Sequence, residues 1–207
     1  MKNKEDYLKT INLKETNETL VSLSTYAKEH HIPIISVEGA QFLRQVIRLK
    51  EVKSVLELGT AIGYSAILMA SINQDINITT LERKESLYLL AKNHIESSLY
   101  KNQITLVHQD AHEYTPQQTF DMIFIDAAKA QNKTFFERFE GYLNPKGVIV
   151  VDNLLFHTLV GTNQGSRNVR ALTRKIDDFN HYLMTRQDYH SVIYPIGDGM
   201  SVSIKKD

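Results

Sequence analysis

The chain has 207 residues, of which 42% are hydrophobic, and its 24 basic and 24 acidic side chains cancel to a formal net charge of zero. This length and composition fit one domain with a substantial core, and they exclude broad electrostatic attraction to nucleic acid or membrane, so any such binding needs a local patch. The absence of cysteine excludes disulfides and thiolate metal sites, which leaves histidine or oxygen ligands for any metal.

The first fifty residues are predicted to form a helical extension ahead of the first strand. A polar, helix-permissive region covers roughly residues 4–30, and Ser36 is an N-cap candidate for a helix over residues 36–50. The N-terminus lacks the apolar core of a signal peptide, and no later segment has the roughly 18 apolar residues that cross a bilayer. We therefore expect a single domain over residues 1–207, with residues 1–50 as its extension, in a cytoplasmic protein without a membrane partner.

Strands and helices alternate from residue 53 onward. Strands are predicted at residues 53–58, 77–82, 104–110, 120–126 and 147–153, and helices at 64–72, 84–100, 132–142 and 167–183. Such alternation predicts a doubly wound α/β fold in which a mostly parallel sheet carries helices on both faces. Two strand-like runs, 190–196 and 200–205, flank Gly197-Asp198-Gly199 and predict a C-terminal antiparallel hairpin. The sequence therefore predicts a Rossmann-like sheet of seven strands.

The segment from Val55 to Ser65 runs from a predicted strand through a glycine turn into a helix start. Its glycines, Gly59 and Gly63, allow the backbone to approach a ligand closely. Their spacing is G-x-x-x-G, without the G-x-G-x-x-G that brings a pyrophosphate onto a helix N-terminus. The turn therefore favours a nucleotide-like ligand that lacks phosphates. A turn that merely joins strand and helix is the alternative.

Acidic or amide side chains stand at the C-terminal ends of successive predicted strands. They are Glu57, Glu82, Asp110, Asp126, and the adjacent pair Asp152 and Asn153. Ligands of an open α/β sheet bind outside these ends, so we expect the six polar groups to converge on one edge. Glu82 can accept hydrogen bonds from both ribose hydroxyls of a cofactor, as an acidic residue does in a dehydrogenase. A solvated carboxylate at the strand end is the alternative.

Glu57-Leu58-Gly59 followed by Gly63-Tyr64-Ser65 resembles the first motif of S-adenosylmethionine (SAM)-dependent methyltransferases, in particular the catechol and caffeoyl-CoA O-methyltransferase group. The resemblance implies a methyltransferase sheet and a SAM site, from which S-adenosylhomocysteine (SAH) leaves. The cofactor residues that it implies are Glu57, Gly59, Ala61, Gly63, Ser65, Glu82, Asp110, Ala111 and Asp126. In this interpretation Glu57 orders the glycine turn or meets the cofactor's amino group, Glu82 binds ribose, and Asp110 with Ala111 borders adenine.

Two further segments match the family's metal-binding and catalytic motifs, namely Phe124 to Lys129 and Val151 to Asn153. Two carboxylates and one amide, from Asp126, Asp152 and Asn153, give hard oxygen donors that suit Mg²⁺, with Mn²⁺ or Ca²⁺ as competitors. Helix capping by the two aspartates is the alternative. Lys129 matches the family's proposed general base, so the resemblance implies Lys129 and Asp126 as catalytic residues. Such a lysine needs a nearby cation and burial to lose its proton, and a phosphate or carboxylate partner is its alternative role.

A metal with two open positions favours an acceptor with two adjacent oxygens, such as a catechol or 5-hydroxyuridine. The chain departs from the catechol enzymes at Ala127-Ala128, where they carry a bulky aromatic, and at Met200-Ser201, where they carry an acid. From His31-Ile32-Pro33 to Met200, it resembles the bacterial branch that methylates 5-hydroxyuridine at the tRNA wobble position. We therefore expect tRNA as the substrate and 5-methoxyuridine as the product. Methylation of a small catechol-like or acyl-CoA phenol is the alternative.

The predicted helix over residues 167–183 is amphipathic. Arg167, Arg170 and Arg174 fall within about 60° of one another, opposite its apolar face, and arginine forks suit the phosphates of an RNA backbone. An ordinary solvated face is the alternative, because Asp177 and Asp178 follow. A nicotinamide oxidoreductase and a noncatalytic SAM- or RNA-binding module are further alternatives. Since related enzymes are commonly dimers, the resemblance also implies a homodimer.

Overall fold

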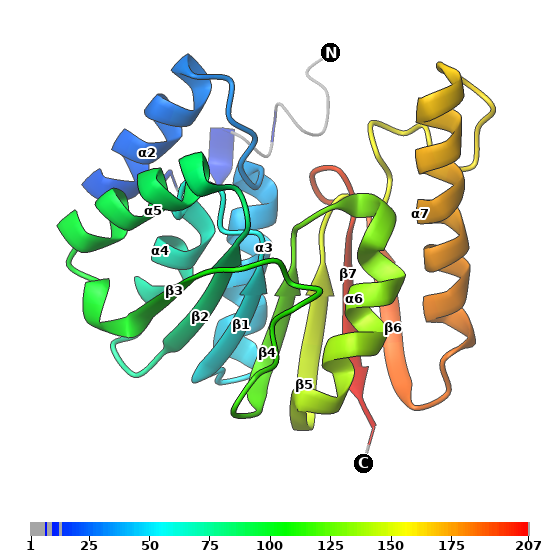
Figure 1. The fold of residues 1–207 in the computed structure, drawn as a ribbon. Coiled ribbons are helices and arrows are strands. Elements are labelled where there is room, and N and C mark those ends of the chain that lie inside the picture. The colour runs from blue at the N-terminus through cyan, green and yellow to red at the C-terminus, as the bar shows by residue number, and fades with distance from the viewer. Residues whose placement is uncertain (1–6, 8–9, 13, 207) are drawn as a thin grey trace.

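A twisted sheet with helices on both faces forms the centre of the protein (Figure 1). The structure is a computed structural model that describes residue 7, residues 10–12 and residues 14–206. The predicted helical region over residues 4–30 therefore lies partly outside the described residues. Within the described part, no helix combines the length and the apolar character needed to cross a membrane.

The helices and strands occur in the predicted alternation. The helices are α2 (Glu18–Glu29), α3 (Val37–Leu49), α4 (Tyr64–Ala70), α5 (Glu85–Ser97), α6 (Asn132–Phe139) and α7 (Arg167–Thr185), with short 3-10 turns η1 (Lys101–Gln103), η2 (Lys129–Gln131) and η3 (Glu140–Tyr142). The strands are β1 (Ser54–Leu58), β2 (Asn77–Glu82), β3 (Ile104–His108), β4 (Phe120–Ile125), β5 (Leu143–Val151), β6 (Tyr189–Tyr194) and β7 (Met200–Lys205).

The strand order is β3-β2-β1-β4-β5-β7-β6. The first five strands in this order pair in parallel, whereas β7 runs antiparallel to both β5 and β6. The predicted fold class, a mostly parallel sheet of seven strands with a C-terminal antiparallel hairpin, is therefore confirmed. The chain order reverses between β1 and β4, which opens a crevice at the carboxyl edge of the sheet.

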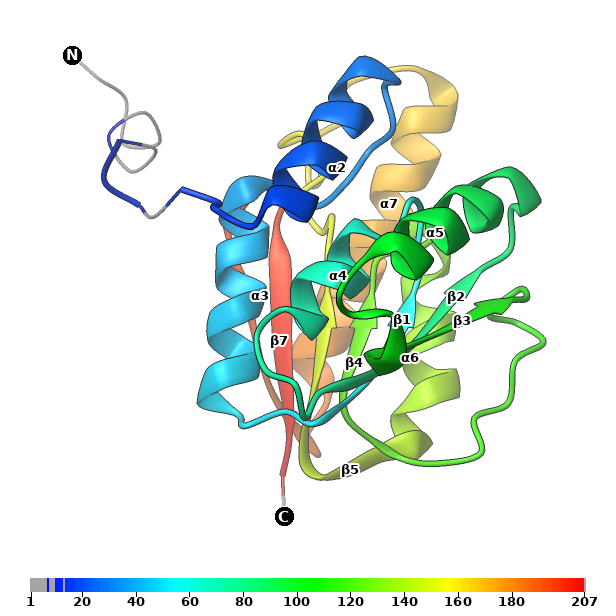
Figure 2. The ribbon, with the colours of Figure 1, turned by 90° about the vertical axis from the view of Figure 1, so that its left-hand side faces the viewer.

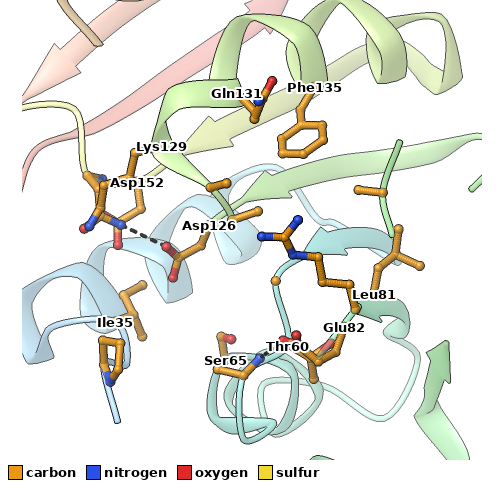
Figure 3. Close-up of a pocket in the computed structure, with 18 of the residues that line it drawn as sticks. Ile35, Thr60, Ser65, Leu81, Glu82, Asp126, Lys129, Gln131, Phe135 and Asp152 are labelled. Atoms are coloured by element: carbon orange, nitrogen blue, oxygen red, sulfur yellow. Dashed lines mark hydrogen bonds between the residues drawn. The ribbon is translucent and has the colours of Figure 1, made fainter. Parts of the chain in front are cut away.

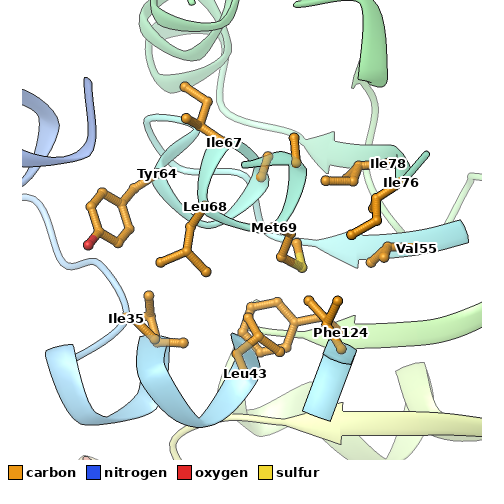
Figure 4. Close-up of a cluster of buried hydrophobic side chains, with 14 of the residues drawn as sticks. Ile35, Leu43, Val55, Tyr64, Ile67, Leu68, Met69, Ile76, Ile78 and Phe124 are labelled. Carbon is orange, nitrogen blue, oxygen red and sulfur yellow. The ribbon is translucent and has the colours of Figure 1, made fainter. Parts of the chain in front are cut away.

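Two hydrophobic cores cover the two faces of the sheet, because successive residues of a strand point to opposite sides. In β5, Val148 and Val150 pack into the core under α2 to α5, while Ile149 and Val151 pack into the core under α6 and α7. Figure 4 shows the first core, where Leu43 of α3 faces α4 and Phe124 of β4. Figure 2 shows α2 and α3 beside α4, so the N-terminal helices complete this face.

Two element boundaries differ from the prediction in an informative way. β5 begins at Leu143, which pairs with Phe120, and a register shift follows before Met122 pairs with Val148. The predicted start at residue 147 was wrong because Pro145 and Gly147 resemble a turn in sequence, although the strand passes through them with an irregularity. The predicted helix over residues 84–100 ends earlier, at Ser97, and the 3-10 turn η1 follows.

The N-cap predicted for α3 is confirmed. Ser36 Oγ accepts a hydrogen bond from the backbone N–H of Gly39 at 3.0 Å, which satisfies one free donor of the first turn. Asn17 caps α2 in the same way, since its Oδ1 accepts from the N–H groups of Thr19 and Leu20. These two caps fix where each helix begins. The segment between the helices, which ends at Ser36, lies at the carboxyl edge of the sheet.

Candidate active site

A cavity of about 660 Å³ opens at the carboxyl edge of the sheet. Seven residues predicted to bind the cofactor line it, namely Gly59, Ala61, Ser65, Glu82, Asp110, Ala111 and Asp126. The predicted metal and catalytic residues Asp126, Lys129, Asp152 and Asn153 line the same cavity. Figure 3 shows the glycine-turn side at one end and Lys129 with Asp152 at the other, with Asp126 between them. The expected convergence of polar groups on one edge is confirmed for these residues.

The glycine turn brings β1 close to the end of β4. Gly59 has a φ of 101°, and a Cβ added there would lie 2.1 Å from the backbone oxygen of Asp126. Only glycine fits this crossing. Gly63 also has a positive φ, of 88°, but it is the N-cap residue of α4 and faces Ile95 of α5. Gly63 is not among the residues that line the cavity.

Glu57 lies beneath the turn, fully buried, and does not line the cavity. Its Oε2 accepts a hydrogen bond from the Thr80 hydroxyl, which is itself 2.6 Å from the Thr60 hydroxyl. Burial raises the pKa of Glu57 to about 7, a rise that the Ser65 and Thr80 hydroxyls oppose and the charge of Glu82 supports. This position suits the first of the two predicted roles, ordering of the glycine turn.

Glu82 is held as a rigid acceptor at the cavity wall. Its Oε2 accepts from the backbone N–H of Ala61 at 3.0 Å, and its Oε1 accepts from the N–H of Lys84 at 2.8 Å. The carboxylate therefore connects the end of β2 to the glycine turn. Each carboxylate oxygen has two lone-pair sites, so both oxygens can still accept from hydroxyl groups of a ligand.

Asp110 follows β3 and lines the end of the cavity away from Lys129 and Asp152. Its Oδ1 accepts from the backbone N–H of His112 at 2.9 Å, and its Oδ2 lies 3.3 Å from Nη1 of Arg83. The hydrogen bond from His112 lowers the pKa of Asp110 most, and Arg83 contributes in the same direction, so the group stays ionised. Sequence reasoning missed Gln131 and Phe135, which line this end. The sequence does not indicate that Phe135 lines a cavity, because an aromatic residue on a helix is typical of core packing.

Asp126 and Asp152 place two carboxylates at the ends of neighbouring strands. Burial raises the pKa of Asp126 to about 6, with the charge of Glu57 as the next cause. Burial likewise raises the pKa of Asp152 to about 7, and the negative charge of Asp126 adds to this rise. Two carboxylates that are largely removed from water and repel each other bind a proton or a cation readily.

Asn153 connects the two carboxylates. Its Nδ2 donates to Asp126 Oδ1 at 2.9 Å, and its backbone N–H donates to Asp152 Oδ1 at 2.6 Å. Among residues 14–206 and the few described before them, no group of three or more His, Cys, Asp or Glu side chains is arranged to hold a metal ion. A metal centre here would depend on the Asn153 amide as its third donor. The two carboxylates and the amide fit the oxygen-donor chemistry of Mg²⁺.

Lys129 begins the 3-10 turn η2, directly after the Asp126 segment. Its positive charge lowers the pKa of both Asp126 and Asp152, although burial has the larger, opposite effect. Its Nζ lies 5.3 Å from the centroid of the Phe156 ring. The ammonium group is thus placed between an aromatic ring and two acidic groups, at the end of the cavity away from Glu82.

Three further contributions to this end of the cavity were not predicted as site residues. The segment Pro33–Ser36, between α2 and α3, lines the cavity from the N-terminal helices. Asp198, in the hairpin turn before β7, and His157, after β5, also line it. The chain brings these residues together over long sequence distances, so no local pattern indicates them.

Arg167, Arg170 and Arg174 are exposed along α7, while Ile176, Phe179 and Leu183 are buried. The predicted amphipathic helix is therefore confirmed. The three arginines do not line the cavity. However, α7 contacts η2, and its first turn lies on the side of the molecule where β1, β4 and β5 end (Figure 1). Arg170 Nη1 also donates to the backbone oxygen of Gly165 at 2.7 Å.

Residues 9–206 match the family described as O-methyltransferase, so the chain belongs to this family. The catechol O-methyltransferase of Niastella koreensis is 31% identical over 67% of this chain and 67% of its own length. Tapetum-specific methyltransferase 1 of Arabidopsis thaliana is 26% identical over 92% of this chain and 84% of its own length.

Solved structures agree with this assignment. A Staphylococcus aureus protein, provisionally assigned as a caffeoyl-CoA O-methyltransferase, is 36% identical with a TM-score of 0.88, over 98% of this chain and 97% of its own. The O-methyltransferase from Bacillus cereus in complex with SAH has the same fold, with 23% identity and a TM-score of 0.82 over 97% of this chain and 96% of its own. The protein is thus a SAM-dependent O-methyltransferase of the caffeoyl-CoA and catechol type. The oxidoreductase and noncatalytic alternatives are set aside.

Proposed function

We propose that this protein transfers a methyl group from SAM to the 5-hydroxyl of 5-hydroxyuridine at the tRNA wobble position, which yields 5-methoxyuridine and SAH. The reaction would depend on a divalent cation, Mg²⁺ or else Mn²⁺ or Ca²⁺. The observation that carries the proposal is one cavity that joins the glycine turn to Asp126, Asp152, Asn153 and Lys129. Methyl donor and acceptor would therefore occupy adjoining parts of one cavity.

One half of the cavity, the cofactor half, is lined by Gly59, Glu82, Asp110 and Ala111 and suits SAM in three respects. Gly59 lets the turn after β1 pack directly against the backbone of Asp126, where a Cβ would collide, and both residues line the cavity where the methionine portion would lie. Glu82 offers a fixed carboxylate for the ribose hydroxyls. Asp110 and Ala111 border the far end, where the Asp110 carboxylate can accept from the adenine amino group.

Asp126, Asp152 and Asn153 would hold the divalent cation at the acceptor half. When bound, the cation lowers the pKa of an acceptor hydroxyl and orients its oxygen. Nζ of Lys129 would accept the hydroxyl proton. The acceptor oxygen then forms a bond to the methyl carbon of SAM as the carbon–sulfur bond breaks, and the sulfur keeps the electron pair, so that the sulfonium becomes the neutral thioether of SAH.

Two features support tRNA as the acceptor. In 5-hydroxyuridine the 5-hydroxyl and the 4-carbonyl are adjacent oxygens, which suits two open positions on a cation. The exposed arginines of α7 supply a local basic patch on a chain whose net charge is zero. Their helix contacts η2, which begins at the cavity residue Lys129, and arginine side chains suit the phosphates of an RNA backbone.

The test combines a cellular and a purified assay. Mass spectrometry of tRNA nucleosides should show that a strain lacking this gene loses 5-methoxyuridine and that the wild-type gene restores it. Purified protein with labelled SAM and Mg²⁺ should methylate tRNA that contains 5-hydroxyuridine. Unchanged 5-methoxyuridine in the deletion strain, together with no transfer to this tRNA, would refute the proposed acceptor.

A catechol-like or acyl-CoA phenol acceptor is the second candidate, because a catechol O-methyltransferase is among the relatives. Against it, Met200 and Ser201 are not acidic and do not line the cavity, although Asp198 nearby does. The same labelled-SAM assay with 3,4-dihydroxybenzoate and with caffeoyl-CoA distinguishes the candidates. Transfer to one of these phenols with none to tRNA would select the second.

A further inference from the structure

Three consecutive residues after β5 adopt left-handed backbone conformations. Phe156, His157 and Thr158 have φ values of 41°, 54° and 62°. Each such conformation is unfavourable for an L-residue with a side chain, and a run of three is more so. Contacts from elsewhere in the chain must therefore hold this turn in place.

Asp198 supplies such contacts. Its Oδ1 accepts a hydrogen bond from the backbone N–H of His157 and lies 3.6 Å from Nδ1 of the same residue. Its backbone oxygen accepts from the N–H of Leu155 at 2.8 Å, directly before the left-handed turn. A single residue thus holds the turn through its side chain and the entry to the turn through its main chain.

The neighbouring glycine allows this close approach. Gly199 has a φ of 89°, and a Cβ added there would lie 2.5 Å from Leu155 Cγ and 2.8 Å from Leu155 N. Its backbone oxygen accepts from the N–H of Leu154 at 2.9 Å. Hydrogen bonds therefore join the hairpin turn before β7 to the loop after β5, so the two segments form one unit. Asp198 supplies the side-chain hydrogen bond between them.

This unit carries side chains to the acceptor half of the cavity. The Phe156 ring lies beneath the ammonium group of Lys129, with 5.3 Å between Nζ and the ring centroid. An aromatic face attracts a cation, so the position of the ring favours one placement of Lys129. His157 and Asp198 line the same cavity, and the His157 side chain is 75% exposed.

We propose that Asp198 is a positioning residue for methyl transfer: its carboxylate holds the Phe156–Thr158 turn, and the turn places Lys129 through the ring of Phe156. The inference rests on the role of Lys129 in the proposed function, and it holds for any hydroxyl acceptor. A different role for Asp198 would be purely electrostatic, because its negative charge also acts on Asp152. The two roles differ in what an asparagine at this position would do.

The experiment compares the full-length wild type with Asp198→Ala and Asp198→Asn. Asparagine keeps an oxygen that can accept from the His157 N–H, whereas alanine does not. Asp75→Asn is the matched control, since Asp75 is exposed just before β2, at the opposite edge of the sheet. Four quantities are measured: hydrogen exchange of residues 155–160, the acetylation rate of Lys129 by mass spectrometry, the SAM dissociation constant, and kcat with tRNA containing 5-hydroxyuridine and with 3,4-dihydroxybenzoate.

We expect Asp198→Ala to speed exchange of residues 155–160 by about tenfold or more, because a hydrogen bond to a charged group is lost. The acetylation rate of Lys129 should change by about two- to fivefold. The kcat should fall by about ten- to a hundredfold, with the SAM dissociation constant within about twofold of wild type. Asp198→Asn should recover most of each effect, and Asp75→Asn should show none.

Unchanged exchange and acetylation in Asp198→Ala would overturn the positioning role. If Asp198→Asn is as impaired in kcat as Asp198→Ala while its exchange stays slow, the charge acts on the site directly and the proposal is wrong. A failure of the proposed function is recognised separately. In that case the wild type methylates neither acceptor, but the exchange and acetylation rates still decide whether Asp198 holds the turn.

Discussion

Asn153 and Asp126 follow different strands, yet the amide nitrogen of Asn153 donates to Asp126 Oδ1 at 2.9 Å. The bond aligns the ends of β5 and β4, and it leaves the Asp152 carboxylate to be held by the backbone N–H of Asn153. Asn153 has a φ of 67°, which asparagine tolerates better than most residues. One residue thus orders both acidic groups of the candidate metal centre.

Removing one of these acidic groups should abolish the response to a divalent cation. We expect Asp152→Asn to lower the methyl-transfer rate by at least about a hundredfold at saturating SAM, because only one carboxylate then remains. Wild-type protein treated with a chelator should lose activity and regain it when Mg²⁺ is titrated back. The Asp75→Asn variant serves as the control. Full activity in the chelator would contradict a metal-dependent reaction.

Lys129→Met should separate proton removal from cofactor binding. Methionine keeps an unbranched chain beside Phe156 but has no group that accepts a proton. We expect kcat to fall by about 10²- to 10⁴-fold, the range of general acid–base contributions, with the SAM dissociation constant nearly unchanged. Single-turnover kinetics and calorimetry measure the two quantities. An unchanged kcat would remove Lys129 from the mechanism.

Gly59→Ala should destabilise the fold as well as the cofactor site. The added Cβ would lie 2.1 Å from the backbone oxygen of Asp126, and the alanine would have to adopt a φ of 101°. We expect a loss of roughly 2 to 4 kcal/mol in the free energy of unfolding, measured by denaturant titration. Gly141→Ala is the matched control, because a Cβ there meets nothing within 4 Å. Equal stability of both variants would show that the strand crossing can relax.

The buried carboxyl group of Glu57 should make stability depend on pH. Its pKa is raised from 4.5 to about 7 in the folded protein, so the folded state binds more protons than the unfolded state between these values. The free energy of unfolding should therefore fall as pH rises from 4.5 to 7, by on the order of 3 kcal/mol at most.

Asp126 and Asp152 shift in the same direction, so the measurement uses metal-free protein in a chelator and compares the wild type with Glu57→Gln. The glutamine cannot titrate, and its curve of unfolding free energy against pH should be flatter across this window. Parallel curves for the two proteins would show that Glu57 does not carry the dependence. Glu85 is exposed, so the Glu85→Gln variant shows how the loss of a surface charge alone changes the curve of unfolding free energy against pH.

Much of the site could be predicted from sequence because parallel strands present all their carboxyl ends at one edge. Asp126 and Asp152 each follow a buried strand, and that position alone places them near each other once the strands are neighbours. Glu57 shows the limit of this argument. Its position at the end of β1 did not reveal that its side chain lies beneath the turn and outside the cavity.

Contacts between distant segments could not be predicted. Asp198 reaches the cavity because the hairpin turn is fastened to the loop after β5, and this depends on the pairing of β7 with β5. Arg186 shows the same limit away from the cavity. It bonds Glu140 and Asp188 and lies 5.6 Å from the ring of Phe136, a cluster that ties the end of α7 to α6 and η3. No periodicity indicates such partners.

The segment Pro33–Ser36 lines the cavity although it precedes the first strand and belongs to the N-terminal helices. Figure 3 shows Ile35 across from Lys129 and Asp152, on the opposite side of Asp126. A chain that lacks residues 1–50 would retain all seven strands of the sheet and all the predicted metal ligands. It would lose the segment Pro33–Ser36, which lines one side of the cavity. A change in the segment Pro33–Ser36 can therefore alter the shape of the cavity while the sheet stays the same.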